Sequence, residues 1–187
     1  MGLFAFVVSS RGGAAAARAG EPERREGNLG PPGTSDLWRA RLVNGRYEKP
    51  ESLRPRFNTP GEDIEPWIST DGRLMIFSSK ARPDTHGSYD LYASRLCDDG
   101  WTEPRNLGDL VNSPGWDFGA RPTPDGRWLM FTSNRGYTDQ ALDHALDYAG
   151  LLKKIRSPGN GLRDIHRVEM SSLDLPRCAE KATVRAR

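Results

Sequence analysis

The stretch Thr123-Pro-Asp-Gly-Arg-Trp-Leu-Met-Phe-Thr-Ser133 predicts a tight turn followed by a short buried strand. Asp125 and Gly126 favour the turn, because glycine adopts positive φ without steric cost and aspartate hydrogen-bonds to its own backbone. The apolar run from Trp128 to Phe131 is too short for a helix and therefore indicates a strand.

A second copy of this phrase, Ser69-Thr-Asp-Gly-Arg-Leu-Met-Ile-Phe-Ser-Ser79, lies 54 residues earlier. Residues 36–80 align with 90–134 without a gap, and 15 of the 45 positions are identical. The identical pairs include Asp36/Asp90, Asn58/Asn112, Asp63/Asp117, Asp71/Asp125, Phe77/Phe131 and Ser79/Ser133. An ungapped match of this length indicates an internal repeat, and repeats of several short strands are typical of propellers and other β arrays.

Each repeat unit is predicted to hold four short strands. In the complete unit we expect them near residues 65–70, 73–79, 89–96 and 100–107. Asn44-Gly45 is a hairpin signal between the last two strands of the preceding unit. Since four strands make one propeller blade, we expect an all-β fold, a partial β-propeller of about three blades. The outer two blades are expected to be incomplete, and one helix is inserted.

The first 34 residues allow more than one interpretation. Residues 1–10 could be a signal peptide with 14–20 as its cleavage region, but no basic residue precedes the short apolar stretch. Alternatively, Phe6-Val-Val-Ser-Ser-Arg11 is a repeat strand like Met75-Ile-Phe-Ser-Ser-Lys80. We favour the strand, which implies that the chain begins within a repeat. Residues 11–34 have almost nothing to bury and predict a mobile loop.

The pattern changes after Arg135. Within an insertion spanning 137–156, residues 138–156 predict a helix with Thr138 as N-cap and basic residues at the end. Its expected apolar stripe consists of Leu142, Ala145, Leu146, Ala149 and Leu152. Residues 163–169 then resume the repeat. The propeller domain is expected to span 1–175, and the tail at 176–187, beginning from about Asp174, to be frayed.

Composition excludes some classes of protein. The formal charge of +2 is spread along the chain, which gives no case for nucleic-acid binding. The sequence contains no run of 18 apolar residues, and therefore no predicted transmembrane helix. Cys97 takes the place of Val43 in the other repeat, which favours a small apolar strand residue. A disulfide with Cys178 stays open, because two cysteines do not decide the pairing.

These motifs resemble the TolB-like, or WD40-like, β-propeller repeat family of bacteria. The matching phrases are Pro124-Asp-Gly-Arg127 with Phe131-Thr-Ser-Asn-Arg135, Asp90-Leu-Tyr-Ala-Ser94, and Gly100-Trp-Thr-Glu-Pro-Arg-Asn-Leu-Gly108. Thr70 departs from the motif by replacing proline. The resemblance implies a periplasmic or secreted protein whose blades bind partners, sometimes beside a peptidase or other enzyme domain. One complete blade between two incomplete ones would leave open faces, so we expect an N-terminally truncated member or self-association.

An acidic cluster is the candidate for catalysis. Glu62, Asp63 and Glu65 lie near Trp67, and Asp117 repeats Asp63. A glycosidase needs two carboxylates across a cleft. The competing interpretation is structural, in which Asp63 and Asp117 hold loop backbone in each blade. We favour the structural interpretation and assign no catalytic, cofactor or metal residue.

The remaining chemically interesting residues have simpler interpretations. Asp71 and Asp125 belong to turns, and the repetition of Ser9, Ser78 and Ser133 indicates a structural role. His86, His144 and His166 lack metal-ligand spacing, and His144 is expected to pair with Asp147 on the helix surface. The aromatic residues Trp67, Trp101, Trp116 and Trp128 could stack on a ligand, but packing between blades is favoured.

Two functions follow as hypotheses. The first is a non-catalytic binding module whose unequal loops, 11–34 and 136–162, meet a protein or cell-envelope ligand. The alternative is a hydrolase, either glycan-acting or the propeller of a peptidase whose catalytic domain is missing. No cofactor is expected for either.

Overall fold

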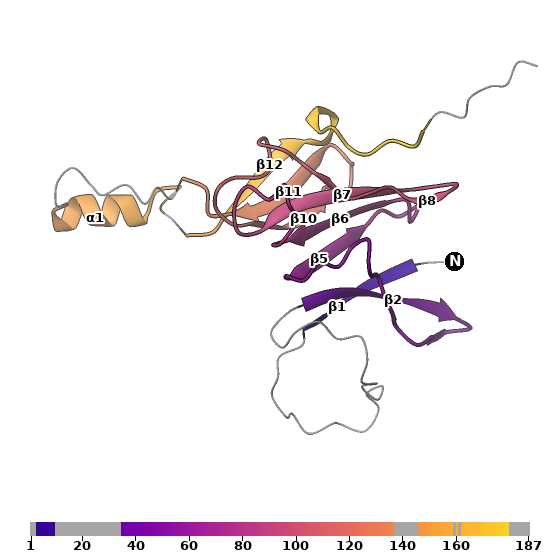
Figure 1. Ribbon diagram of the computed structural model, residues 1–187. Helices are drawn as coiled ribbons and strands as arrows, with labels where there is room; N and C mark the ends of the chain where they lie inside the picture. The colour runs from indigo at the N-terminus through magenta and orange to yellow at the C-terminus, as the bar shows by residue number, and fades with distance from the viewer. Residues whose placement is uncertain (1–2, 10–34, 137–145, 159, 161, 180–187) are drawn as a thin grey trace, which may run out of the picture.

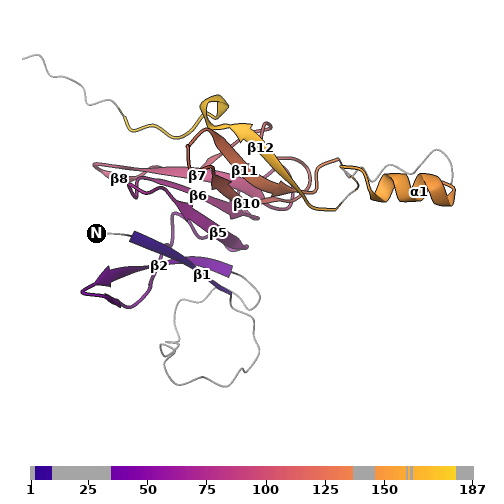
Figure 2. The same cartoon turned by 180° about the vertical axis from the view of Figure 1, so that it is seen from behind.

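The computed structural model describes residues 3–9, 35–136, 146–158, 160 and 162–179 of the 187-residue chain. The fold is all-β, a partial propeller in which three antiparallel sheets stack side by side. One α-helix of the described residues projects from an end of the stack (Figure 1, Figure 2). The expected fold class is thereby confirmed.

The first sheet contains β1 (Leu3–Ser9), β2 (Ser35–Val43), β3 (Arg46–Tyr47) and β4 (Glu51–Ser52). Strands β1 and β2 pair antiparallel along the whole of β1, with Ser9 opposite Ser35. The backbone of residues 3–9 therefore follows the strand interpretation. The mobile loop predicted at 11–34 lies outside the described residues.

The second sheet contains β5 (Asp63–Ile68), β6 (Leu74–Ser79), β7 (Asp90–Cys97), β8 (Gly100–Trp101) and β9 (Arg105–Asn106). Its first strand, predicted near 65–70, begins two residues earlier, at the buried Asp63, and has a β-bulge after Ile64. The predicted outer strand 100–107 is two short pieces, both paired with β7. Pro104 stands between them without an N–H to donate.

The third sheet contains β10 (Asp117–Pro122), β11 (Trp128–Ser133) and β12 (Asp164–Glu169), followed by the short 3-10 helix η1 (Met170–Ser172). In the described part of the chain, no fourth strand pairs with β12, and no strand of the first sheet corresponds to β5. The outer two blades are thus incomplete within the described residues, as predicted.

Two apolar clusters hold the sheets together. Between the first and second sheets lie Leu37, Phe57, Met75, Phe77 and Tyr92. Between the second and third lie Leu74, Ile76, Leu91, Ala93, Leu107, Val111, Ala120, Leu129, Phe131 and Leu173. Trp101 packs against the first cluster and Trp67 against the second, as predicted for aromatic residues between blades. Burial of these side chains, at roughly 25 cal/mol per Å² of apolar surface, is the main stabilisation of the stack.

The two turns that define the repeat form as predicted. Gly72 and Gly126 have φ of 72° and 70°. Asp71 accepts a hydrogen bond from the Arg73 amide at 3.0 Å, and Asp125 accepts one from the Arg127 amide at 3.1 Å. A side chain at either glycine would be strained by the positive φ.

The inserted helix α1 (Tyr148–Ile155) begins later than predicted. Its N-cap is Asp147, whose carboxylate accepts a hydrogen bond from the Gly150 amide at 2.7 Å. Thr138, the predicted N-cap, lies outside the described residues, as does His144, the predicted partner of Asp147. None of the α1 residues is buried, and Leu142 and Ala145 of the predicted apolar stripe lie outside the described residues.

A disulfide joins Cys97, at the end of β7, to Cys178, with Cα atoms 5.6 Å apart. Cys97 lies in a strand, as predicted, and the pairing with Cys178 that the sequence left open is formed. The segment before Cys178 was expected to fray, but the Pro176 carbonyl accepts a hydrogen bond from Arg95 at 2.7 Å, and Asp174 pairs with Arg105. Residues 174–178 are therefore tied to the second sheet, and 180–187 lie outside the described residues.

Candidate binding face

One end of the stacked sheets gathers the longer loops. Strand pairing places Asp63, Ser79 and Asp90 at the same end of the second sheet. It places Asp117, Ser133 and Asp164 at the corresponding end of the third. The segments 53–62, 80–89, 107–116, 134–136 and 146–163 leave from this end, apart from the undescribed residues 159 and 161. We call this end the loop face.

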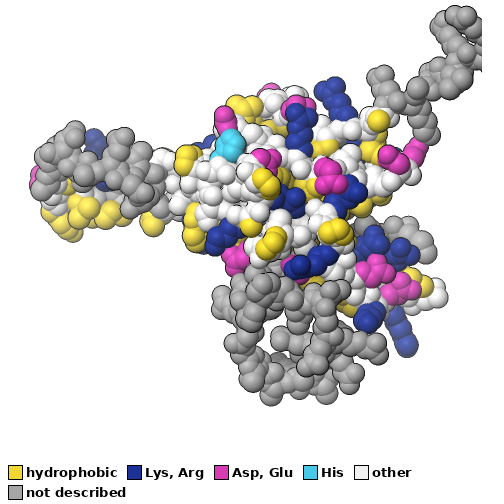
Figure 3. Space-filling model, in the orientation of Figure 1, with side chains coloured by type: hydrophobic (Ala, Val, Ile, Leu, Met, Phe, Trp, Pro, Cys, Tyr) yellow, Lys and Arg dark blue, Asp and Glu magenta, His cyan; other side chains and the backbone are white. Residues whose placement is uncertain are grey.

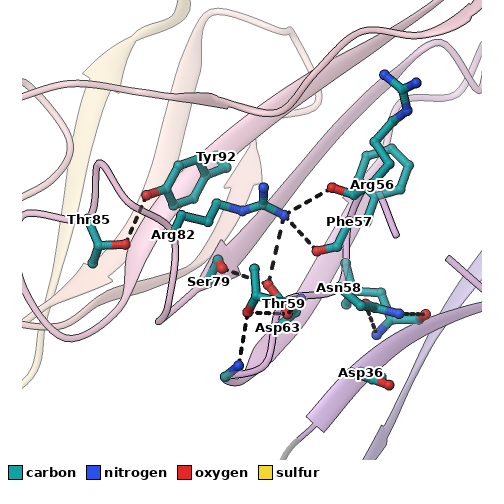
Figure 4. Close-up of polar contacts among 12 residues, drawn as sticks. Asp36, Arg56, Phe57, Asn58, Thr59, Asp63, Ser79, Arg82, Thr85 and Tyr92 are labelled. Carbon is teal, nitrogen blue, oxygen red and sulfur yellow. Dashed lines mark hydrogen bonds and ion pairs between the residues drawn. The ribbon is translucent and has the colours of Figure 1, made fainter. Parts of the chain in front are cut away.

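Asp63 anchors the loop that precedes it (Figure 4). The carboxylate is completely buried and accepts hydrogen bonds from the Thr59 amide at 2.5 Å and the Ser79 hydroxyl at 2.6 Å. The Arg82 guanidinium lies 4.0 Å from it and donates to the Phe57 carbonyl at 2.7 Å. Burial raises the pKa of Asp63, although the hydrogen bonds from Ser79 and Thr59 act to lower it. The hydrogen bonds of this carboxylate are thus all made to groups within the protein.

Asp117 makes the same contacts one blade further on. It is completely buried and accepts from the Ser113 amide at 2.6 Å and from Arg135 at 3.1 Å. Arg135 also donates to the Val111 carbonyl, which occupies the repeat position of Phe57. The structural interpretation of the two aspartates is confirmed. Neither carboxylate is accessible to a substrate.

Two asparagines hold the same loops at a second point. The side chain of Asn58 accepts from the Leu37 amide at 2.7 Å and donates to the Leu37 carbonyl at 2.9 Å. Asn112 repeats both bonds with Leu91, at 2.7 and 3.0 Å. Each asparagine lies in the loop that leads into the next blade and bonds the backbone of a strand in the preceding blade. These paired bonds hold the loop to that strand.

A cluster of charged and aromatic residues lies in the loops 53–62 and 80–89. The Tyr89 hydroxyl donates to the Glu62 carboxylate, and Lys80 lies 3.4 Å from Glu62 and 5.5 Å above the Tyr89 ring. Burial raises the pKa of Tyr89, and its bond to Glu62 adds to that effect. The hydroxyl therefore stays protonated and serves as a hydrogen-bond donor.

Three aromatic rings and an arginine extend this cluster across two blades. The Tyr89 ring centroid lies 5.8 Å from that of Trp116 and 6.5 Å from that of Phe118. The Arg163 guanidinium lies 5.2 Å above Trp116 and 5.1 Å above Phe118. We call Tyr89, Trp116, Phe118 and Arg163 the aromatic patch. Trp116 is 40% exposed, so the patch presents a flat ring and a cation to solvent, a combination suited to ligand stacking.

Helix α1 carries three exposed apolar side chains on the loop face. Tyr148, Leu151 and Ile155 are 77%, 45% and 50% exposed. Their spacing of three and four residues places them on one side of the helix. Figure 3 shows the corresponding hydrophobic surface along α1, well away from the sheets. We call these three residues the α1 stripe. None of the residues of α1 is buried.

The remaining predicted candidates do not join in a site. The Glu65 Oε2 atom is buried beside Gly119 and has no hydrogen-bond partner among the described atoms. His86 pairs with Asp109 at 3.0 Å, and the His166 ring stacks on Phe131. No metal-ligand cluster occurs in the described residues. Sequence reasoning missed the roles of Lys80, Arg82, Tyr89 and Arg163. Only Arg82 had a signal, since it follows Ser79 much as Arg135 follows Ser133.

We expect the Glu62 contacts to produce a pH-dependent stability. The pKa of Glu62 lies below its ordinary value of 4.5, chiefly because the Tyr89 hydroxyl donates to it, with a further contribution from Lys80. A carboxyl group whose pKa is lowered by folding stabilises the folded state above its unfolded pKa and loses that contribution as the pH falls through the folded pKa.

The measurement is urea unfolding of wild type and Glu62→Gln from about pH 6 down to about pH 3. The stability advantage of wild type should be less than about 1 kcal/mol, because the site is partly solvated, and should vanish at the acid end. Tyr89→Phe should reduce the same pH-dependent component. An advantage that is constant over this range would contradict the assignment.

Neither a scan against models of protein families nor a search among curated proteins finds a match for this chain. The resemblance to TolB-like repeats stays a prediction, and the fold stands on the strands and their pairing. In the described part of the chain, no helix has the length and apolar character needed to span a membrane.

Proposed function

We propose that this protein is a non-catalytic binding module whose loop face takes a protein or cell-envelope ligand. The single observation that carries the proposal is the α1 stripe, an exposed apolar surface on a helix of which no residue is buried. Exposed apolar surface of this kind is typical of binding sites. Covering a side chain such as Leu or Ile contributes roughly 1.5–3 kcal/mol, enough to make three such residues a useful anchor.

The neighbouring groups support a ligand that combines apolar and anionic character. Lys153 and Lys154 lie in the last turn of α1, and the helix has no acidic residue in its first turn. On the same face, the aromatic patch adds Arg163 over two aromatic rings. The Cys97–Cys178 disulfide supports a periplasmic or secreted location, because such bonds persist in oxidising compartments.

The test compares retained partners on immobilised wild type and on a variant lacking residues 137–160. We expect the deletion to keep the β-type circular dichroism spectrum and to lose the partners that wild type retains. A triple variant, Tyr148→Ser with Leu151→Ser and Ile155→Ser, should lose the same partners, whereas Lys153→Ala should keep those that bind through the apolar stripe. An unchanged set of partners on both the deletion variant and the triple serine variant would refute the role of α1.

The hydrolase alternative gains no support from Asp63 and Asp117, since both carboxylates are buried and bonded within the fold. A screen with glycoside and peptide substrates on wild type and on Asp63→Asn with Asp117→Asn addresses it directly. Hydrolysis that depends on these two residues would overturn the structural interpretation.

A further inference from the structure

The outer edge of β12 differs from the matching edges of the other two blades. In the first blade, β4 pairs with β2, with Glu51 opposite Arg39. In the second, β9 pairs with β7, with Asn106 opposite Tyr92. The chain then continues along each edge, where the Leu53 and Leu107 amides donate to the carbonyls of Leu37 and Leu91 at 3.1 and 3.0 Å. Strand β12 pairs with β11 on one side and with no described strand on the other.

The open edge leaves one apolar residue exposed that the other blades bury. Ile165 follows Asp164 as Leu37 follows Asp36 and Leu91 follows Asp90. Leu37 and Leu91 are both 0% exposed, whereas Ile165 is 74% exposed. In the first two blades, the cover and the backbone bonds come from the outer strand and from the asparagine that follows it. An aliphatic residue at this position therefore fits a covered state better than a solvated one.

Arg167 in β12 takes the same place as Arg39 in the first blade. Arg39 is the third residue after Asp36 and pairs with Glu51 of the outer strand at 2.9 Å. Arg167 is the third residue after Asp164, and its guanidinium lies 4.4 Å above the Trp128 ring. This contact holds the guanidinium over the paired strand β11, and the long arginine side chain can turn from there toward the outer edge of β12. An acidic side chain on an incoming strand would meet it as Glu51 meets Arg39.

We propose that the edge of β12 binds an extended segment of a partner protein as the missing fourth strand of the third blade. Backbone hydrogen bonds along the edge give such a strand its affinity, and side-chain positions give it specificity. The first blade supplies the pattern, which is an acidic residue opposite Arg167, leucine two positions later and asparagine seven positions later, as in Glu51, Leu53 and Asn58. This surface is separate from the α1 stripe, so the proposal does not depend on it.

The test uses a labelled peptide with the sequence of residues 48–60, Glu-Lys-Pro-Glu-Ser-Leu-Arg-Pro-Arg-Phe-Asn-Thr-Pro. Fluorescence anisotropy is measured with the full chain and with Arg167→Glu, whose folding is checked by circular dichroism. We expect the peptide to bind wild type and to bind Arg167→Glu about fivefold more weakly, the upper end of the effect of one cross-strand charge pair. A peptide carrying Glu51→Lys should show the opposite preference. Ile165→Asp should weaken both peptides.

Several outcomes would overturn the proposal. One is a lack of binding, and another is binding that ignores the charge exchange. If the peptide binds only after residues 180–187 are removed, the edge belongs to the chain's own tail. If wild type sediments as a dimer that Arg167→Glu dissociates, the occupant is a second copy. The serine triple variant of the α1 stripe should bind the peptide normally, which separates this result from the test of the proposed function.

Discussion

Asp117→Ala is expected to lower the free energy of unfolding by about 3–4 kcal/mol, the usual effect of removing one partner from a buried ion pair. The variant leaves the Arg135 guanidinium without its carboxylate and the Ser113 amide without its acceptor. Each buried group left unsatisfied costs about 1–3 kcal/mol. Urea unfolding at neutral pH measures the change, and Asp63→Ala should behave similarly because it removes the matching contacts of the second blade.

The matched control is Asp125→Ala. Asp125 bonds a turn amide at the opposite end of the third sheet and is exposed to solvent. We expect this change to cost far less stability than Asp117→Ala, because an exposed hydrogen bond is replaced by bonds to water. Equal losses for Asp117→Ala and Asp125→Ala would show that the buried carboxylate is not a principal support of the loop face.

Cys178→Ser should destabilise the chain by about 4 kcal/mol. The disulfide joins residues 81 positions apart, and closing a loop of that size restricts the unfolded chain by roughly this amount. It also secures the segment from Leu173, which packs in the core between the second and third sheets. Thermal unfolding followed by circular dichroism gives the difference.

Cys97→Ser is the companion variant and should lose the same amount as Cys178→Ser. Wild type in excess reductant should unfold like either variant, while the variants themselves should not respond to reductant. A reduced wild type as stable as the oxidised protein would mean that the cross-link adds nothing to folding.

The parts of the fold that could be predicted are those with local physical signals. The turns at Asp71 and Asp125 and the strands after them follow from glycine conformation and apolar runs, and the ungapped repeat extends them to whole blades. The start of β5 was misplaced because the bulge leaves Glu65 at φ 52°, where its counterpart is Gly119. The alternation of apolar and polar residues does not reveal where a strand contains a β-bulge, so the position of this bulge could not be predicted.

The tertiary contacts were harder to predict because their partners lie far apart in the chain. Arg82 and Arg135 perform the same task, yet a one-residue offset hides their equivalence in the alignment. The aromatic patch joins Tyr89, Trp116 and Arg163 from three separate loops. Cys178 comes near Cys97 only because the chain turns back after η1 toward the second sheet. No sequence spacing encodes these approaches, which depend on how the blades stack.

The most direct test of the binding proposal is site-specific photo-crosslinking. A photoreactive amino acid is placed at Leu151 in the α1 stripe, at Trp116 in the aromatic patch, or at Arg73 in a turn at the opposite end of the sheets. The account predicts adducts with the same ligand from positions 151 and 116, and none from 73. Adducts from position 73 alone, or equal labelling from all three positions, would contradict a binding site on the loop face.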